Sequence, residues 1–228
     1  MSSPRISVII PTFNRAHLLP RSIDSLLSQT LSAHSVVIVD DGSTDGSFAV
    51  IKELSEMDTH INLFQFHRNY GKSAALAEGF KYAEGDQIIT MDADLQDDPS
   101  EITNLVQKIE EAFDLVSGWK KNRKDPLSKK LPSKLFNFIT RLFTGVRIHD
   151  FNCGLKIYRK AVIKTLDIYG GRHRYIPALA GQKKFKVAEI VVNHRPRLHG
   201  ETKYGGSRFI HGIIHMISVS YRHLRAHA

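Results

Sequence analysis

The sequence of 228 residues contains a single cysteine, Cys153. One cysteine excludes an intramolecular disulfide framework and is typical of a protein from a reducing compartment. The first five residues, Met1 to Arg5, lack the apolar run of a signal peptide. No stretch reaches the roughly 18 apolar residues of a membrane-spanning helix. These absences argue against a secreted, disulfide-bonded protein and against a spanning helix within this sequence.

Both common phosphate-binding loops are also absent. The sequence has no Walker A motif, and no G-x-G-x-x-G follows its first predicted strand. Their absence argues against an ATPase and against a nicotinamide-dependent dehydrogenase. If the protein binds a diphosphate without a glycine-rich cradle, a metal ion must neutralise most of its charge.

Acidic residues are scarce in the second half of the chain. Residues 1–116 carry 8 Lys and Arg against 18 Asp and Glu, whereas residues 117–228 carry 24 against 5. This asymmetry suggests two roles in one fold. The acidic half is suited to hold a metal, and the basic half to meet phosphates, nucleic acid or an anionic membrane.

Strand and helix patterns alternate four times in the first half, which favours βαβ units with a mostly parallel sheet. The length favours one α/β domain over two. The predicted strands are Ile6–Ile10, Val36–Val39, Ile61–Phe66 and Asp86–Met91, and the predicted helices are Asn14–Leu27 with Asn14 as N-cap, Ser47–Met57, Lys72–Ala83 and Pro99–Ala112.

The second half is basic and less regular. Its clearest element is an amphipathic helix over residues 131–146, in which Leu135, Phe138, Ile139, Leu142 and Phe143 share one face. That face is expected to join the core; the alternative is an interfacial helix lying on a membrane. Further elements are a strand at Ala188–Val192, a basic loop at His194–Lys203 and a helix at Phe209–Val219.

The clearest functional motif is Asp92-Ala93-Asp94, which directly follows the strand ending at Met91. Open α/β sheets bind ligands at the carboxyl ends of their strands. Two carboxylates at i and i+2 suit a divalent cation that keeps waters and binds substrate phosphates. The simpler alternative is a solvated acidic turn.

Polar turns also follow the first and second predicted strands, at Pro11–Asn14 and at Asp40-Asp41. Since the carboxyl ends of parallel strands share one edge, these turns are expected to line one crevice with Asp92 and Asp94. A base or ribose is a natural partner for Asp40 or Asp41. Asp40–Asp45 also has the composition of an Asx-capped turn, and both interpretations can hold together.

Five segments together resemble glycosyltransferase family 2, and more closely its polyprenyl-phosphate branch. They are ISVIIPTFN (6–14), VIVDDGSTD (37–45), RNYGKSAALAEG (68–79), GDQIITMDADLQDDP (85–99) and HRPRLHGETKY (194–204). The resemblance covers residues 6–209 and implies a single Rossmann-like GT-A domain, with a donor half at 1–116 and an acceptor half at 117–228 that carries the amphipathic helices.

The resemblance also implies roles for individual residues of the donor site. It implies nucleoside contacts at Pro11, Phe13, Arg15, Val39 and Asp41, although relatives often carry Glu where Arg15 stands. It implies a site for Mg²⁺ or Mn²⁺ and the donor diphosphate at Asp92, Ala93, Asp94 and Gln96, with Asp94 as the direct metal ligand. Trp119 stands where some relatives have an arginine near the phosphates, and Lys120, Arg123 and Lys124 are candidate substitutes.

On the acceptor side the resemblance implies inverting sugar transfer from GDP-mannose or UDP-glucose to a dolichyl or undecaprenyl phosphate. Asp150 is expected to position the acceptor or act as a weak base, or else to be structural. Arg195, Arg197 and Lys203 are expected to clamp the acceptor phosphate, with Arg174 at the lipid entrance.

The resemblance places the protein at the cytoplasmic face of a membrane. Relatives often continue into C-terminal transmembrane helices, so we expect either a membrane region removed after residue 228 or peripheral docking. The oligomeric state stays open.

Three rival functions remain to be compared. A family 2 transferase acting on a soluble or polysaccharide hydroxyl is the nearest. A phosphatase of the haloacid dehalogenase type shares Asp-x-Asp, but usually needs Thr or Val at the position of Gln96 and places the pair after the first strand. A basic nucleic-acid-binding module lacks a recognisable motif, and we expect no nucleic-acid partner.

Overall fold

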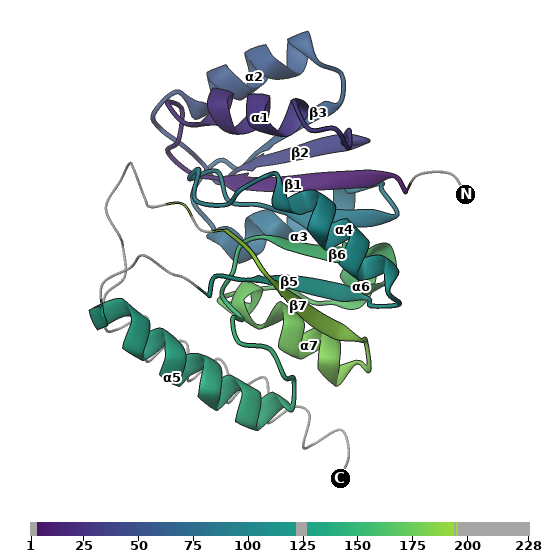
Figure 1. Ribbon diagram of the computed structural model, residues 1–228. Helices are drawn as coiled ribbons and strands as arrows, with labels where there is room; N and C mark the ends of the chain where they lie inside the picture. Colours follow the sequence, from purple (N-terminus) through teal and green to yellow (C-terminus); the bar gives the residue numbers. More distant parts are fainter. Residues whose placement is uncertain (1–3, 122–126, 194, 196–228) are drawn as a thin grey trace.

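The computed structural model describes residues 4–121, 127–193 and 195, apart from the side chains of residues 127–132 (Figure 1). Seven strands form one sheet in the order β3-β2-β1-β4-β6-β5-β7. The strands are β1 (Ile6–Thr12), β2 (Ser35–Asp40), β3 (Ile61–Gln65), β4 (Gln87–Thr90), β5 (Leu115–Trp119), β6 (Lys156–Arg159) and β7 (Val187–Val191). The helices are α1 (Leu19–Leu27), α2 (Ser47–Met57), α3 (Lys72–Tyr82), α4 (Glu101–Glu110), α5 (Leu127–Thr144), α6 (Lys160–Thr165) and α7 (Ile176–Gln182), with a 3₁₀ turn, η1, at Arg172–Tyr175.

The first half forms the parallel strands that its sequence pattern predicts. β1 pairs in parallel with both β2 and β4, and β2 pairs in parallel with β3. The central residues of these strands, such as Ile9, Val37 and Ile88, are fully buried. Continuous Val and Ile runs of this kind are typical of parallel strands covered on both faces. The carboxyl ends of β1, β2 and β4 therefore meet at one edge.

The second half completes the sheet in a less predictable way. β6 lies antiparallel to both β4 and β5, whereas β5 and β7 are parallel to each other. The sheet is therefore mostly parallel, as expected, with β6 as the exception. β5, β6, α6 and α7 were not anticipated, because these elements are short and the four residues of β6 begin with Lys156 and end with Arg159.

Helices cover both faces of the sheet (Figure 1). One apolar cluster joins the sheet to α1, α2 and α4, through residues such as Ile23, Ile51 and Leu105. The opposite cluster contains Leu76 of α3, Val162 of α6 and Ile176 of α7. Both faces are buried, so the ligand-accessible part of the sheet is the edge formed by its strand ends.

Two predicted helix starts are wrong. Asn14 is not an N-cap: α1 begins at Leu19, and Asn14 instead adopts a left-handed conformation at φ 51°. Pro20 sits in the first turn of α1, where a missing N–H costs nothing. Pro99 was expected in the first turn of α4, but it precedes Ser100, the N-cap of that helix.

The expected core face of α5 is the largest correction. Leu135, Phe138, Leu142 and Phe143 are between 49% and 72% exposed, and of the five predicted residues Ile139 alone packs against a core cluster. A neighbouring stripe, with Phe136 and Thr140, is buried instead. Phe136 packs near Tyr175, at 5.5 Å between ring centroids. The periodicity identified the helix correctly but not the side of it that is buried.

Among the described residues, no helix is both long enough and apolar enough to cross a bilayer. The predicted helix at 209–219 lies outside the described residues, as do Arg197 and Lys203.

Candidate functional site

The acidic loop after β4 is a compact turn. Leu95 adopts φ 60°, and the Gln96 amide donates to Asp94 Oδ1 at 3.2 Å. The Asp92 amide donates to Asp97 Oδ2, also at 3.2 Å. Asp97 is buried and pairs with Lys120, whose Nζ lies 2.8 Å from Asp97 Oδ1. Asp97 therefore stabilises the conformation of the loop, and Asp92 and Asp94 are the carboxylates in it that could bind a ligand.

Asp92 and Asp94 sit in different electrostatic environments. Burial raises the pKa of Asp92, but its ion pair with Lys72, together with the Lys120 and Lys156 cations, outweighs burial and holds that pKa below the usual range. Burial is also the main cause that raises the pKa of Asp94, and the nearby Asp92 and Asp97 carboxylates add to it. The two carboxylates of the motif therefore have pKa values shifted in opposite directions.

The donor set of this loop fits a hard divalent cation. Carboxylate oxygens are the ligands that Mg²⁺ and Mn²⁺ favour, and a cation beside Asp94 would relieve the repulsion that raises its pKa. In the described part of the chain, no three Asp, Glu, His or Cys side chains converge into a complete metal cage. Two carboxylates without a cage match an ion that completes its shell with waters and substrate phosphate.

Hydrogen bonds connect the turn after β1 to the turn after β2. The Asn14 amide donates to Ser43 Oγ at 2.8 Å, and Thr44 N donates to Asn14 Oδ1 at 2.9 Å. Asp40 accepts from Ser43, as the Asx-turn interpretation predicts. Asp41 is buried, and its carboxylate accepts from the backbone amides of Tyr70 and Gly71. Asp40 and Asp41 therefore stabilise the loops that form this side of the crevice.

The predicted nucleoside contacts lie along this edge. Pro11 lines a pocket that also includes Asp92, whereas Phe13 and Arg15 follow it in the β1–α1 turn. Val39 is fully buried in the core. Arg15 donates to the carbonyl of Asn14 at 2.9 Å. Ala93, between the two carboxylates of the acidic loop, is buried in a core cluster.

Arg195, from the predicted basic loop, contacts the acidic loop directly. Arg195 N donates to the Gln96 carbonyl at 3.1 Å, and Arg195 Nη2 lies 3.0 Å from Asp98 Oδ1. The structure thus brings Arg195 beside Gln96, although about 100 residues separate them in the sequence. Arg197 and Lys203 follow in the chain but lie outside the described residues.

The structure also places Asp150, Trp119 and Lys120, which were named from the sequence. Asp150 is buried, and its Oδ1 accepts from the Asn152 amide at 3.0 Å. Trp119 stacks on His149, with ring centroids 4.2 Å apart. Lys120, one candidate for meeting the donor phosphates, instead pairs with Asp97 inside the loop; Arg123 and Lys124 lie outside the described residues.

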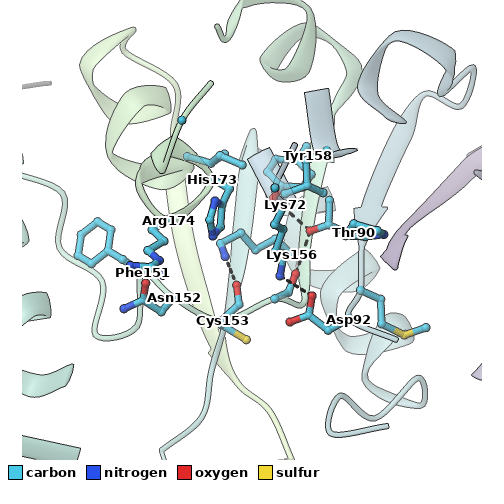
Figure 2. Close-up of a pocket in the computed structure, with 17 residues that line it drawn as sticks. Lys72, Thr90, Asp92, Phe151, Asn152, Cys153, Lys156, Tyr158, His173 and Arg174 are labelled. Carbon is cyan, nitrogen blue, oxygen red and sulfur yellow. Dashed lines mark hydrogen bonds and ion pairs between the residues drawn. The ribbon is translucent and has the colours of Figure 1, made fainter. Parts of the chain in front are cut away.

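A pocket of about 430 Å³ opens beside Asp92 (Figure 2). Its walls come from the start of α3, the end of β4, the segment leading into β6, and η1. Figure 2 shows Lys72 joined to Asp92 and the Lys156 side chain reaching the carbonyl of Cys153. His173 Nδ1 lies 2.8 Å from Ser73 Oγ, and burial lowers the pKa of His173, so the imidazole is neutral at pH 7. Arg174 also lines this pocket.

Sequence reasoning missed Lys72 and Lys156. Lys72 is the first residue of a predicted helix, and Lys156 lies in β6, a strand that was not predicted, so neither lysine was identified as a site residue.

The sequence profile of Glycosyl transferase family 2 matches residues 7–167. An undecaprenyl-phosphate 4-deoxy-4-formamido-L-arabinose transferase from Shewanella sediminis is 40% identical over 88% of this chain and 62% of its own length. A dodecaprenyl-phosphate galacturonate synthase from Rhizobium johnstonii is 36% identical over 97% of this chain and 68% of its own length. The chain therefore spans about two thirds of the length of these curated relatives.

Solved structures share the fold at low sequence identity. Glucosyl-3-phosphoglycerate synthase from Mycobacterium tuberculosis, in complex with Mn²⁺, UDP-glucose and phosphoglyceric acid, superposes with a TM-score of 0.75 at 17% identity, over 95% of this chain and 80% of that one. A mannosyltransferase from Pyrobaculum calidifontis with GDP-mannose and Mn²⁺ gives 0.69 at 19% identity, over 97% and 65%.

Proposed function

Because the chain belongs to glycosyl transferase family 2 and has its GT-A fold, we propose that it transfers a sugar from a nucleotide sugar to a polyprenyl phosphate. The two curated relatives described above, whose names specify polyprenyl-phosphate acceptors, support this choice of acceptor. A transferase acting on a soluble or polysaccharide hydroxyl is the alternative within the family.

The contact between Arg195 and the acidic loop carries the proposal. It joins a site suited to a metal-bound diphosphate, at Asp92 and Asp94, to the start of a basic loop suited to a second phosphate. An enzyme that moves a sugar between two phosphates needs both kinds of site close together. A phosphatase or a nucleic-acid-binding module gives no reason for this pairing.

The residues divide the chemistry between them. Asp92 and Asp94 would hold Mg²⁺ or Mn²⁺, which when bound neutralises negative charge on the diphosphate leaving group. Pro11, Phe13, Arg15, Val39 and Asp41 lie along the edge where the nucleoside would bind. The side-chain amide of Gln96 donates to the Arg195 carbonyl at 3.4 Å. This hydrogen bond holds the acidic loop against the segment proposed to bind the acceptor phosphate.

The acceptor side needs orientation more than deprotonation. A phosphate monoester has a second pKa near ~6, so its oxygen is largely ionised at neutral pH and can attack the anomeric carbon with inversion. Arg195, with Arg197 and Lys203 beyond it, would orient that phosphate, and Arg174 would assist at the lipid entrance. Asp150 would act as a positioning group, since it is buried and already accepts from Asn152.

The donor is open among a small set. GDP-mannose and UDP-glucose follow from the resemblance of the sequence, whereas the relatives' names add a 4-formamido-arabinose and a galacturonate. A panel of these nucleotide sugars in thermal-shift measurements, with and without Mg²⁺ or Mn²⁺, tests the proposal. We expect metal-dependent stabilisation by one donor, lost in Asp94→Asn and kept in Asp24→Asn, an exposed position on α1. No response to any donor would refute the proposed function.

We also propose that α5 rests on an anionic membrane, at its cytoplasmic face. The exposed side chains Leu135, Phe138, Leu142 and Phe143 form an apolar surface, here called the α5 apolar face. Lys134, Arg141 and Arg147 accompany it, and no acidic residue occurs from 126 to 149. Apolar side chains with basic neighbours and no acidic ones match the interface of an anionic leaflet.

A further inference from the structure

The pocket beside Asp92 carries more positive charge than its own carboxylate balances. Of the described residues that line it, Lys72, Lys156 and Arg174 are cationic and Asp92 alone is anionic. Lys72 forms an ion pair with Asp92, which accounts for one cation and the one carboxylate. Lys156 is a second cation in the same pocket, it is buried, and the ion pair between Lys72 and Asp92 does not compensate it.

Lys156 is the less expected of these two cations. It projects from β6, is 4% exposed, and its Nζ donates to the Cys153 carbonyl. Among the described residues no carboxylate lies within 4.0 Å of that nitrogen. An ammonium group has three donors, and a neutral carbonyl does not compensate its charge. Burial and the nearby Lys72 cation lower the pKa of Lys156 below its ordinary value, although the Asp150 and Asp92 carboxylates act to raise it.

A buried cation without an ionic partner is costly to maintain in the free protein. The cost is offset when a ligand brings a negative group to it. The pocket has the volume of a small-molecule site, with apolar walls from Leu76, Phe151 and Ile176 and a few polar groups among them. The amino-terminal residues of α3, Gly71 and Lys72, form another wall, and a helix start also favours negative charge.

The position of the pocket identifies which part of a substrate would enter it. Asp92 belongs both to this pocket and to the acidic loop proposed to bind the donor diphosphate. The sugar is bonded to that diphosphate, so it is the part of the donor that would extend into the adjoining space. This step rests on the proposed function.

We propose that the pocket holds the transferred sugar and that Lys156 pairs with a carboxylate on its ring, so that the preferred donor is a nucleotide-linked hexuronic acid. Arg174 lines the same space and adds positive potential there. The lipid phosphate is the other anion that Lys156 would attract. If Lys156 pairs with the sugar carboxylate, its substitution weakens donor binding; if it pairs with the lipid phosphate, its substitution weakens acceptor binding.

Pairs of donors that differ at C6 alone test this directly. Binding of UDP-galacturonate against UDP-galactose, and of UDP-glucuronate against UDP-glucose, is measured by titration calorimetry with Mg²⁺. For the wild-type chain we expect one uronate to bind about tenfold tighter or more than its neutral partner. Lys156→Met is expected to remove that preference while changing the affinity for the neutral sugar by about twofold or less. Lys156→Arg should keep part of it, and Lys183→Met, at an exposed position after α7, should keep all of it.

Each outcome has a separate meaning. Nucleotide sugars that bind without a preference for either uronate overturn the proposal and leave the proposed function standing. The proposal is also wrong if Lys156→Met leaves donor binding unchanged and raises KM for undecaprenyl phosphate, since Lys156 then serves the lipid phosphate. Failure of every nucleotide sugar to bind refutes the proposed function itself. Thermal melting of Lys156→Met shows whether the variant folds; we expect an unchanged or higher Tm, because the variant removes an uncompensated buried charge.

Discussion

Gly154 lies directly against Asp92: a Cβ atom added to Gly154 would overlap the Asp92 carboxylate. The Gly154 carbonyl in turn accepts from Thr90 Oγ1 at 2.9 Å, which fixes the two segments together. The segment that leads into β6 therefore acts as a wall that sets the direction of the first carboxylate of the acidic loop. Only a residue without a side chain leaves room for Asp92 in this orientation.

Substitution of Gly154 by alanine should therefore impair the site without unfolding the protein. The added methyl group must displace the Asp92 carboxylate, and a displacement of about 1 Å in a reacting geometry costs roughly 100-fold in rate. We expect kcat/KM for sugar transfer to fall by about that factor, with Tm changed by a few degrees at most.

Gly145→Ala is the matched control. Gly145 adopts φ +70°, and a Cβ there meets no atom within 4 Å. Alanine at this position should cost about 1–2 kcal/mol of stability through backbone strain and leave kcat/KM unchanged. If Gly154→Ala shows the same pattern as Gly145→Ala, the proposed contact with Asp92 has no role in the site.

The Lys72–Asp92 ion pair predicts a pH-dependent contribution to stability. Because the pKa of Asp92 is lowered in the folded state, the contribution is fully present above the unfolded pKa, near ~4, and is lost as pH falls through the folded value. Lys72→Met should therefore be less stable than wild type at pH 7, and the difference should shrink below pH ~4. Urea unfolding at a series of pH values measures this. A difference that is constant from pH 7 to pH 3 would contradict the ion pair.

We expect the buried Cys153 thiol to react slowly with alkylating reagents. Burial raises its pKa to about 12, and its side chain is 1% exposed. Since the thiolate is the reactive form, alkylation at pH 8 should be at least about 100-fold slower in the folded protein than in urea. The raised pKa also means that stability falls as pH rises above about 9, the ordinary thiol value, because the unfolded chain loses the proton first. The chain has one cysteine, so labelling followed by mass spectrometry reports on this site alone. Rapid labelling of folded protein would show that the pocket wall opens.

The α5 apolar face predicts binding to anionic vesicles. In flotation at low salt, the wild-type chain should rise with phosphatidylglycerol vesicles, and Phe138→Ser combined with Leu142→Ser should remain in solution. Met57→Ser is the control, since Met57 is 78% exposed on α2, away from α5. Equal flotation of the double variant and the wild type would show that another surface binds the membrane. A second copy of the chain is the other candidate to cover this face, and a concentration-dependent dimer lost in the double variant would indicate it.

Most of the first half could be predicted from the sequence, because its signals are strong and local. Continuous apolar runs such as Ile6–Ile10 identify parallel strands, and the bounds predicted for α2 match those observed. The convergence of Pro11, Asp41 and Asp92 at one edge followed from parallel pairing alone. Family 2 membership, expected from five short segments, was confirmed by the family profile over residues 7–167.

The rest depends on contacts between distant residues, which periodicity does not encode. The antiparallel insertion of β6 follows from its pairing with β4 and β5, some 40 to 70 residues earlier. The apolar spacing of α5 is the same whether that face is buried or exposed, so periodicity alone does not distinguish the two arrangements. The Lys72–Asp92 and Lys120–Asp97 ion pairs likewise join residues that are 20 or more positions apart, and only the folded structure identifies them.

The central claim is transfer of a sugar to a polyprenyl phosphate at the Asp92–Asp94 loop. Its most direct test is the incorporation of radiolabelled sugar into organic-extractable lipid when the purified chain is incubated with undecaprenyl phosphate, Mg²⁺ or Mn²⁺ and each labelled donor. We predict labelled lipid with one donor, reduced by at least about 100-fold in Asp94→Asn and unchanged in Asp24→Asn. Absence of labelled lipid with every donor, or undiminished transfer by Asp94→Asn, would contradict the claim.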